Sequence, residues 1–249
     1  MRLSIIILTY DHLDDTRRCL ESLHPIMDRG DIEVIVIDNA SADGTPDYIR
    51  THYPEILLTV NPENRGVAVA RNQGFAQATA PTLLILDNDT IVNARAIDGM
   101  LQYLSTHSDV GLCACRMTDI EGNVQRSFRP FPGLKGKVLS VLGLRLASEK
   151  YRADSEGAIE PYYVIGACQM MRREVLDQVG LLDEAIFYGP EDADLCHRLR
   201  EAGWKIKYLP QYSIIHTYYR RTQRKPFSRL GRKHIQGLLH FYHKHGRIS

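Results

Sequence analysis

The sequence predicts an α/β protein with a mostly parallel central sheet flanked by helices. In the first third of the chain, short apolar runs alternate with segments of helical periodicity, a pattern typical of strand–helix–strand units. The run Leu83–Leu86 contains no polar residue, as expected of a strand buried on both faces of a parallel sheet. The 249 residues suffice for one sizeable domain or two small ones.

The first two strands are predicted over Leu3–Leu8 and Ile32–Ile37, which are both rich in isoleucine. Residues 14–23 between them have the apolar spacing of one helix face. Polar side chains follow both strands: Thr9, Tyr10 and Asp11 after the first, and Asp38 after the second.

The next elements are predicted from turn and helix signals. Residues 39–45 are turn formers, and Pro46 stands at the first turn of a helix that runs to about His52. A third strand is predicted over Ile56–Val60, followed by a loop and an alanine-rich helix over Val67–Ala78. The apolar run Leu83–Leu86 is then the fourth strand.

Two carboxylates, Asp87 and Asp89, directly follow the fourth strand, with Asn88 between them. Alternate residues of an extended chain project to the same side, and ligands of open α/β sheets lie beyond the carboxyl ends of the strands. A divalent cation carrying a diphosphate would hold two such acids together, since hard cations share oxygen ligands with phosphates. The alternative is an Asp-rich turn that bonds its own backbone. Because three predicted strands end in acids, we favour a shared site.

Composition excludes several classes of protein. The net charge of +1 predicts no general affinity for nucleic acid. The cysteines are odd in number and lack paired metal-binding spacing, which indicates reduced thiols in a cytosolic protein. No run approaches the roughly 20 apolar residues of a membrane span. The two commonest glycine-rich phosphate loops are also missing, so a bound nucleotide would depend on acids and a cation.

Four blocks of sequence together resemble the inverting glycosyltransferases of family 2, which have the GT-A fold. The blocks match that family in order and spacing: Ser4–Asp11, Asp38–Thr45, Asn64–Gly74 and Asp87–Asp89. The resemblance covers roughly residues 1–220. The subgroup that it most resembles transfers rhamnose or related sugars during bacterial surface polysaccharide assembly.

The resemblance implies that the first half of the chain binds a nucleotide-diphosphate sugar. The implied ligands of that donor are Thr9, Tyr10, Asp11, Asp38, Arg65, Asn72, Asp87 and Asn88. Carboxylates suit ribose hydroxyls and an Arg fork suits phosphate oxygens, so the physical chemistry agrees. The alternatives are a solvated loop charge for Arg65 and a capping or packing role for Asn72.

The middle of the chain is less regular. A helix is predicted over Ala94–Leu104, a strand over Val110–Met117 and a hairpin turn at Gly122-Asn123. Residues 126–163 carry little regular pattern beyond a short amphipathic helix at 138–146. This stretch is either a flap on the acceptor side or a surface insertion.

Glu191 and Asp192 stand at the start of a predicted helix that ends near Gly203. Acids at this place can simply complement the helix dipole, and Asp194 fits that role as the i,i+4 partner of Arg198. Transfer of a sugar with inversion needs one carboxylate to take the proton of the attacking hydroxyl. In the resembled family the Asp of the Glu-Asp pair is this base, so we assign Asp192 as catalytic with Glu191 in support.

A helix over Glu174–Val179 and strands over Lys205–Leu209 and Tyr212–Ile215 complete the predicted domain. His216 follows the last strand, and a lone histidine is often structural. Its position resembles the family residue that completes the metal site. The predicted metal ligands are therefore Asp87, Asp89 and His216, a set that favours Mn²⁺ somewhat over Mg²⁺.

The sequence after His216 is basic and contains no Asp or Glu. Ile235, Leu238, Leu239 and Tyr242 recur there with helical spacing. A basic amphipathic helix is typical of a membrane-surface element. The alternatives are a helix packed on the domain with a solvated basic face, or a nucleic-acid-binding tail.

These observations predict a metal-dependent inverting glycosyltransferase. The donor would be a nucleotide-diphosphate sugar, such as dTDP-rhamnose or a UDP-sugar, and the acceptor a saccharide, free or linked to polyprenyl diphosphate. We expect a domain over residues 1–220, with a donor half at 1–90 and an acceptor half at 91–220, and an extension at 221–249. The expected location is cytoplasmic, peripheral on the inner face of the membrane.

The sequence is also compatible with two other functions. One is a nucleotidyltransferase, although the first loop lacks the Gly, Arg and Lys residues that would hold a triphosphate. The other is a non-catalytic sugar-nucleotide-binding or docking protein. The two acidic motifs together, Asp87-x-Asp89 and Glu191-Asp192, argue against it.

Overall fold

The computed structural model describes residues 2–129, 157–217 and 228–246. The helix predicted at 138–146, and with it most of the irregular stretch at 126–163, lies outside these residues. Among the described helices, none is both long enough and apolar enough to cross a membrane.

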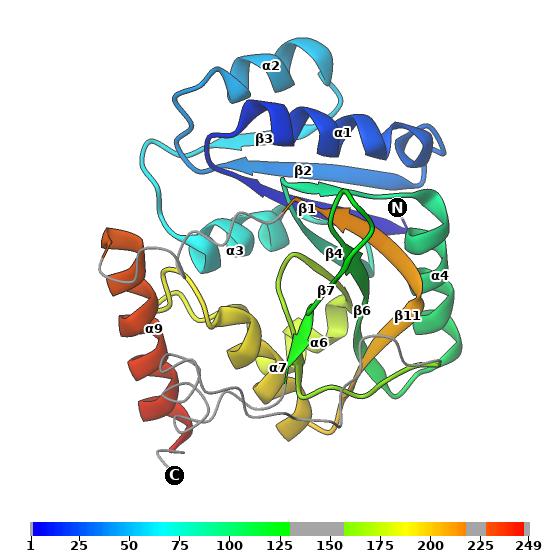
Figure 1. Ribbon diagram of the computed structural model, residues 1–249, viewed down its shortest axis with the longest axis vertical. Coiled ribbons are helices and arrows are strands. Elements are labelled where there is room, and N and C mark those ends of the chain that lie inside the picture. The colour runs from blue at the N-terminus through cyan, green and yellow to red at the C-terminus, as the bar shows by residue number, and fades with distance from the viewer. Residues whose placement is uncertain (1, 130–156, 218–227, 247–249) are drawn as a thin grey trace.

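A single mixed sheet crosses the molecule (Figure 1). Its strands, in spatial order, are β3 (Leu57–Val60), β2 (Ile32–Asp38), β1 (Leu3–Thr9), β4 (Thr82–Asp87), β10 (Cys168–Arg172), β6 (Val110–Thr118), β11 (Lys205–His216) and β5 (Thr90–Ile91), with β7 (Val124–Gln125) paired to β6. A separate small pair joins β8 (Phe128–Arg129) and β9 (Tyr163–Val164). The four strands of the first half are parallel, as predicted.

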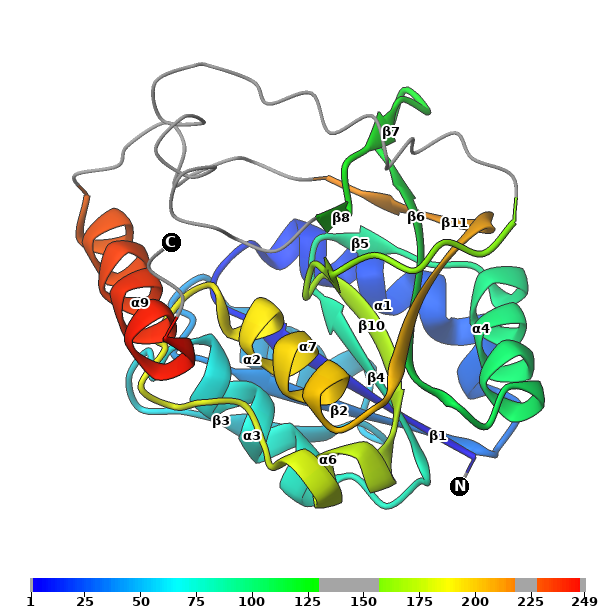
Figure 2. The same cartoon turned by 90° about the horizontal axis from the view of Figure 1, so that it is seen from below.

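Helices cover both faces of this sheet, as Figures 1 and 2 show. On one face α1 (Leu13–Met27), α2 (Thr45–His52) and α4 (Ala94–Thr106) bury their apolar sides. The opposite face is covered by α3 (Val67–Gln77), α6 (Arg173–Val179), α7 (Glu191–Glu201) and α9 (Arg229–His245). The described helices and strands therefore form the layered α/β arrangement that the alternating pattern predicts.

The second half of the sheet differs from the prediction in two strands. β10 lies between β4 and β6 and runs antiparallel to both, and no strand is predicted there from the sequence pattern. β11 is one strand where two were predicted, and its pairing with β6 shifts between Leu209 and Ser213. Pro210 lies in that shift, and a proline, which has no N–H to donate, is tolerated at such an irregularity.

The C-terminal helix α9 is present as predicted, and the apolar residues of its predicted face divide between the domain and solvent. Phe241 and Tyr242 are buried against the domain, together with Gly237. Ile235 and Leu239, which share the predicted apolar spacing with Tyr242, are 46% and 63% exposed. Spacing alone could not distinguish the two faces, because apolar residues lie on both.

Candidate functional site

The carboxyl ends of β1, β2 and β4 meet at one edge of the sheet. The register pairs Thr9 with Asp38 and Leu8 with Asp87, so the predicted acids at the strand ends are neighbours. Just beyond β1, Asp11 has a φ of 57°, which turns the chain sharply away from the sheet. The shared edge that the polar strand ends predicted is therefore present.

Asp38 offers a free acceptor in this edge. Its side chain is buried, and its Oδ1 accepts a hydrogen bond from the backbone N–H of Ser41 at 2.9 Å. Its Oδ2 is also buried and has no hydrogen-bond partner among the described residues. A buried carboxylate oxygen without a donor is costly, so a ligand hydroxyl or N–H would be stabilised here.

The neighbouring side chains mainly join the loops that surround Asp38. Asn88 donates hydrogen bonds to the hydroxyl oxygens of Thr9, at 3.2 Å, and Thr16, at 2.9 Å. Asp11 accepts one from the backbone N–H of Ala42 at 2.9 Å. These contacts link the ends of β1, β2 and β4 into one wall, at which the exposed ring of Tyr10 lies.

The three predicted metal ligands come together. One potential ligand atom from each of Asp87, Asp89 and His216 lies within 4.8 Å of the others. His216 is brought there by the pairing of β11 with β5, and its Nε2 lies 3.4 Å from Asp89 Oδ1. Its other ring nitrogen lies 2.8 Å from Oε1 of Gln125, a partner that would orient the ring. Two carboxylates and an oriented imidazole form a suitable donor set for a divalent cation.

The charges of Asp87, Asp89 and His216 also suit a bound cation. Burial acts to lower the pKa of His216, but the carboxylates of Asp89 and Asp87 outweigh it and raise the pKa. Partial burial raises the pKa of Asp87, Arg71 opposes this rise, and Asp89 adds to it. The acids therefore repel one another in the absence of a cation between them.

Arg71 is the site residue that sequence reasoning missed. It projects from α3, is only 3% exposed, and its Nη2 donates to Asp87 Oδ1 at 2.6 Å and to the carbonyl of Gly166 at 2.9 Å. Its Nη1 donates to Glu191 Oε1 at 3.2 Å. Two signals were available: a charged residue within an alanine-rich helix, and the position of Arg71 inside the resembled block Asn64–Gly74. Arg71 thus joins the end of β4 to the start of α7.

Glu191 and Asp192 begin α7 beside this arginine. Asp192 accepts hydrogen bonds from the backbone N–H of Gly166, at 3.3 Å, and of Ala193, at 2.7 Å. Glu191 is buried, and its Oε2 has no hydrogen-bond partner among the described residues. Burial, followed by the charge of Asp192, raises the pKa of Glu191 to about 7, although Arg71 opposes the shift.

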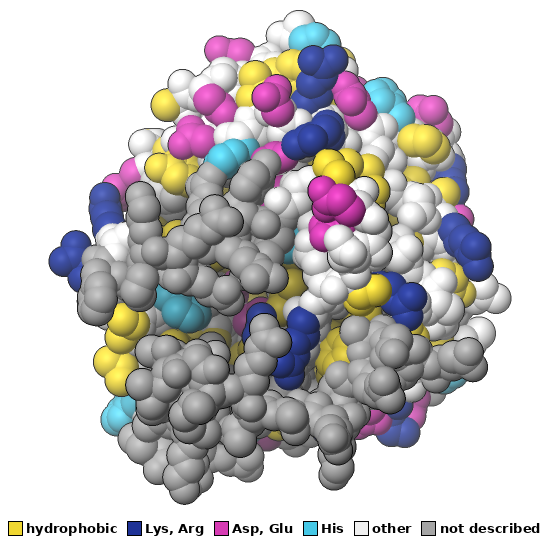
Figure 3. All heavy atoms as spheres, in the orientation of Figure 1, with side chains coloured by type: hydrophobic (Ala, Val, Ile, Leu, Met, Phe, Trp, Pro, Cys, Tyr) yellow, Lys and Arg dark blue, Asp and Glu magenta, His cyan; other side chains and the backbone are white. Residues whose placement is uncertain are grey.

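In Figure 3, basic and acidic side chains are visible together in the hollow at the centre of one face.

The two remaining predicted donor ligands behave differently. Asn72 is buried; its amide nitrogen donates to Glu184 Oε1 at 3.0 Å and to the carbonyl of Leu182, and its amide oxygen accepts from the N–H of Leu182. Asn72 thus supports this loop, which is the packing alternative that the sequence left open. The side chain of Arg65 is exposed, and its role in donor binding stays a prediction.

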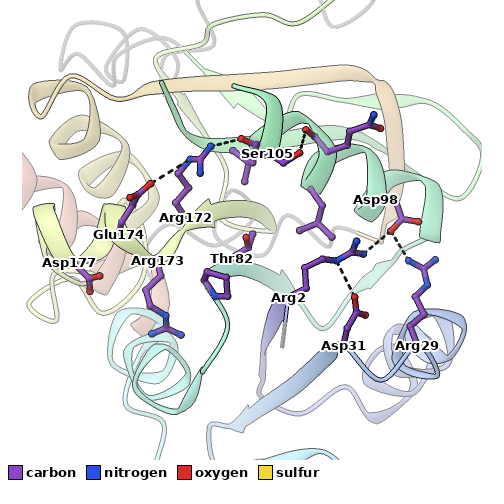
Figure 4. A pocket seen from close by; sticks show the side chains of 14 residues that line it. Arg2, Arg29, Asp31, Thr82, Asp98, Ser105, Arg172, Arg173, Glu174 and Asp177 are labelled. Atoms are coloured by element: carbon purple, nitrogen blue, oxygen red, sulfur yellow. Dashed lines mark hydrogen bonds and ion pairs between the residues drawn. The ribbon is translucent and has the colours of Figure 1, made fainter. Parts of the chain in front are cut away.

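A second hollow lies at the opposite end of the sheet and is lined by arginines (Figure 4). Those arginines already have partners: Arg2 lies 3.2 Å from Asp31, Arg29 lies 2.6 Å from Asp98, and Arg172 donates to a backbone carbonyl at 3.0 Å. The predicted acids Asp38, Asp87 and Asp89 lie at the carboxyl ends of the strands. We therefore place the candidate site at that end of the sheet and not in this hollow.

The chain resembles several known proteins. The family model described as glycosyl transferase family 2 matches residues 4–180. An N-acetylglucosaminyl-diphospho-decaprenol L-rhamnosyltransferase of Mycobacterium tuberculosis is 29% identical, over 98% of this chain and 85% of its own length. A pre-mycofactocin glycosyltransferase of the same species is also 29% identical, over 88% of this chain and 43% of its own.

Solved structures share the fold. A mannosyltransferase of Pyrobaculum calidifontis in complex with GDP-Man and Mn²⁺ matches with a TM-score of 0.68 at 21% identity, over 100% of this chain and 65% of its own. GalNAc-T7 with UDP, GalNAc and Mn²⁺ matches with a TM-score of 0.66 at 17% identity, over 87% of this chain and 43% of its own. These similarities confirm the predicted GT-A fold.

The raised pKa of Glu191 predicts a pH-dependent stability. The folded state keeps a proton on Glu191 up to about pH 7, whereas the unfolded chain releases it near the usual glutamate pKa of about 4.3. The unfolding free energy that Glu191 contributes should therefore fall by on the order of 3 kcal/mol as the pH rises through this window. Glu191→Gln should remove that dependence, as measured by urea unfolding at several pH values with a chelator present. A constant difference between variant and parent from pH 4.5 to 8 would contradict it.

Proposed function

The chain belongs to glycosyl transferase family 2, and from this premise we propose that it is a metal-dependent enzyme that transfers a sugar with inversion from a nucleotide-diphosphate sugar. One observation carries the proposal. Arg71 joins Asp87, a member of the candidate metal set, to Glu191 of the Glu191-Asp192 pair. This single contact supports a common centre for the donor diphosphate and the catalytic acid. Membership of the family argues against both a nucleotidyltransferase and a non-catalytic binding protein.

The donor nucleotide would lie along the edge formed by β1 and β2. The unpartnered Oδ2 of Asp38 supports a hydrogen bond to a ribose hydroxyl or to the base. Thr9, Tyr10 and Asp11 would form the wall of this pocket, and Arg65 would reach the phosphates from the loop before α3. Asn88 would hold the wall in place.

A divalent cation, Mn²⁺ or Mg²⁺, would be held by Asp87, Asp89 and His216. Their mixed oxygen and nitrogen donors, and the mutual repulsion of the two acids, support that assignment. When bound, the cation would offset the negative charge of the departing nucleoside diphosphate. Gln125 would orient His216 toward it.

Asp192 would be the base that takes the proton of the attacking acceptor hydroxyl. Two backbone N–H groups orient its carboxylate, and it stands at the start of α7 next to Glu191, which Arg71 joins to Asp87 of the candidate metal set. Glu191 would support this arrangement through Arg71. One base and one cation suffice for inversion, because the acceptor oxygen attacks the anomeric carbon directly.

The acceptor is proposed from similarity. The M. tuberculosis relative is named for rhamnose transfer to N-acetylglucosaminyl-diphospho-decaprenol. By analogy, we propose dTDP-rhamnose as the donor, ahead of a UDP-sugar, and a saccharide on polyprenyl diphosphate as the acceptor. Such an acceptor would bring the enzyme to the inner face of the cytoplasmic membrane.

The outward face of α9 supports such a membrane contact. Ile235 and Leu239 are exposed there one turn apart, and the exposed Arg232 lies about one turn before Ile235 on the same face. Apolar side chains beside cationic ones suit the boundary of an anionic bilayer.

Donor binding should be visible in thermal stability. A ligand that binds only the folded state raises Tm, so one nucleotide-diphosphate sugar of a panel should raise Tm by several degrees when Mn²⁺ is present. Asp89→Ala should lose the part of the shift that needs the cation. Absence of a shift for every donor with the cation present would count against the proposed donor site.

Asp192→Asn should separate catalysis from binding. A base acts in the transition state, so turnover should fall by at least about 100-fold while the donor Kd changes by less than about twofold. Asp177→Asn, at an exposed position on α6, is the matched control and should retain activity. An equal loss of donor affinity in Asp192→Asn would make Asp192 a structural or metal-binding residue.

The membrane contact has its own test. The double variant Ile235→Asp, Leu239→Asp should reduce cosedimentation with anionic vesicles by roughly tenfold, because it replaces apolar contacts with repelled charges. The control is Ile120→Asp, Val124→Asp, which adds the same charges at exposed apolar positions near β7. Equal loss in both variants would show that net charge, and not this face, governs binding.

A further inference from the structure

We propose that the junction of α7 and α9 holds a second metal site, a Zn²⁺ bound by His197, Glu201 and His245. One potential ligand atom from each residue lies within 4.8 Å of the others. Their rings and carboxylate come from two helices that are distant in sequence. The proposal does not depend on the site at Asp87 or on the transfer reaction.

The geometry on α7 already suits zinc. His197 and Glu201 are one turn apart on the same helix face, and His197 Nε2 lies 3.2 Å from Glu201 Oε1. Two ligands at about 2.1 Å from a tetrahedral zinc are about 3.4 Å apart, so this pair is close to its bound separation. The Glu201 side chain is 62% exposed and free to adjust, and His245 is the last residue of α9.

Both histidines have a second partner that would orient them on a metal. The Nδ1 of His197 lies 2.5 Å from the hydroxyl of Tyr162, which leaves Nε2 toward Glu201. The Nε2 of His245 lies 2.8 Å from Oδ1 of the buried Asp194, so Nδ1 would be its metal ligand. Imidazoles that bind zinc commonly donate their other N–H to a carboxylate or another oxygen.

The nearby cations are already compensated. Lys244 Nζ lies 2.7 Å from Asp183 and 2.9 Å from Asp194. Arg198 Nε lies 2.9 Å from the other oxygen of Asp194. Two neutral imidazoles and one carboxylate form the protein part of a zinc site with a fourth position for water. The exposure of Glu201 leaves that fourth position accessible to solvent.

A zinc here would fasten α9 to the helix that carries the proposed base. His197 is buried, the side chain of His245 is only 7% exposed, and the centroids of their rings are 4.2 Å apart. Occupancy would therefore hold two packed helices together without moving either far.

The test is zinc binding by the full-length protein. Equilibrium dialysis with metal analysis should find one more Zn²⁺ per chain in the parent than in His245→Ala. At a free Zn²⁺ concentration about 100-fold above Kd, Tm should rise by roughly 5–10 °C more in the parent than in this variant. The matched control is His243→Ala, which removes an exposed histidine of the same helix and should keep both effects.

Glu201→Gln is a second variant that controls for a folding defect in His245→Ala. The Glu201 side chain is 62% exposed, so this substitution should leave the fold intact. It should weaken the additional site by roughly tenfold or more. Equal zinc content and equal Tm shifts in the parent, His245→Ala and Glu201→Gln would overturn the proposal. Asp87, Asp89 and His216 are present in every variant. A cation bound by them therefore contributes equally to the zinc content and the Tm shift of each variant. The donor-dependent shift with Mn²⁺ tests that other site separately.

Discussion

The buried guanidinium of Arg71 is the interaction on which the site depends. A buried charge is costly unless its partners compensate it, and Arg71 has two carboxylates and a carbonyl. Burial acts to lower its pKa, but the acids Asp87 and Glu191 outweigh it and raise the pKa. Gly166 is part of this arrangement, because a Cβ there would lie 2.5 Å from Arg71 Nη1. The arginine can approach the backbone only where a side chain is missing.

This contact explains how two stretches of chain form one site. Arg71 and Asp87 belong to the first half of the chain, whereas Gly166 and Glu191 belong to the second. The antiparallel strand β10 places the second group correctly, since it pairs with β4 and the carbonyl of Ala167 accepts from the N–H of Asp87 at 3.1 Å. The one strand that breaks the parallel pattern is therefore the strand that brings Gly166 and the start of α7 to the end of β4.

Local chemistry was predictable from sequence, and long-range pairing was not. The acids after β1, β2 and β4 could be placed together because parallel strands end at the same edge, and the structure confirms this edge. Arg71 and Glu191 are 120 positions apart, and no local pattern relates them. The strand β10 was missed for a similar reason, because its identity depends on partners on both sides. Asn72 was placed near the donor by resemblance, yet the loop at Leu182 occupies its amide.

The same limit applies to α9, whose two faces carry different constraints. A Cβ at Gly237 would lie 2.6 Å from the carbonyl of Gly189, so only a residue without a side chain lets the helix lie this close. Gly189 and Pro190 form the turn that leads directly into Glu191 and α7. The inward face of α9 thus packs against the turn before Glu191 and Asp192, while its outward face presents Ile235 and Leu239. Apolar spacing predicted a helix here, but the small residue that brings it close to the site is invisible to a search for apolar periodicity. The basic extension is therefore a structural neighbour of the acids at the start of α7.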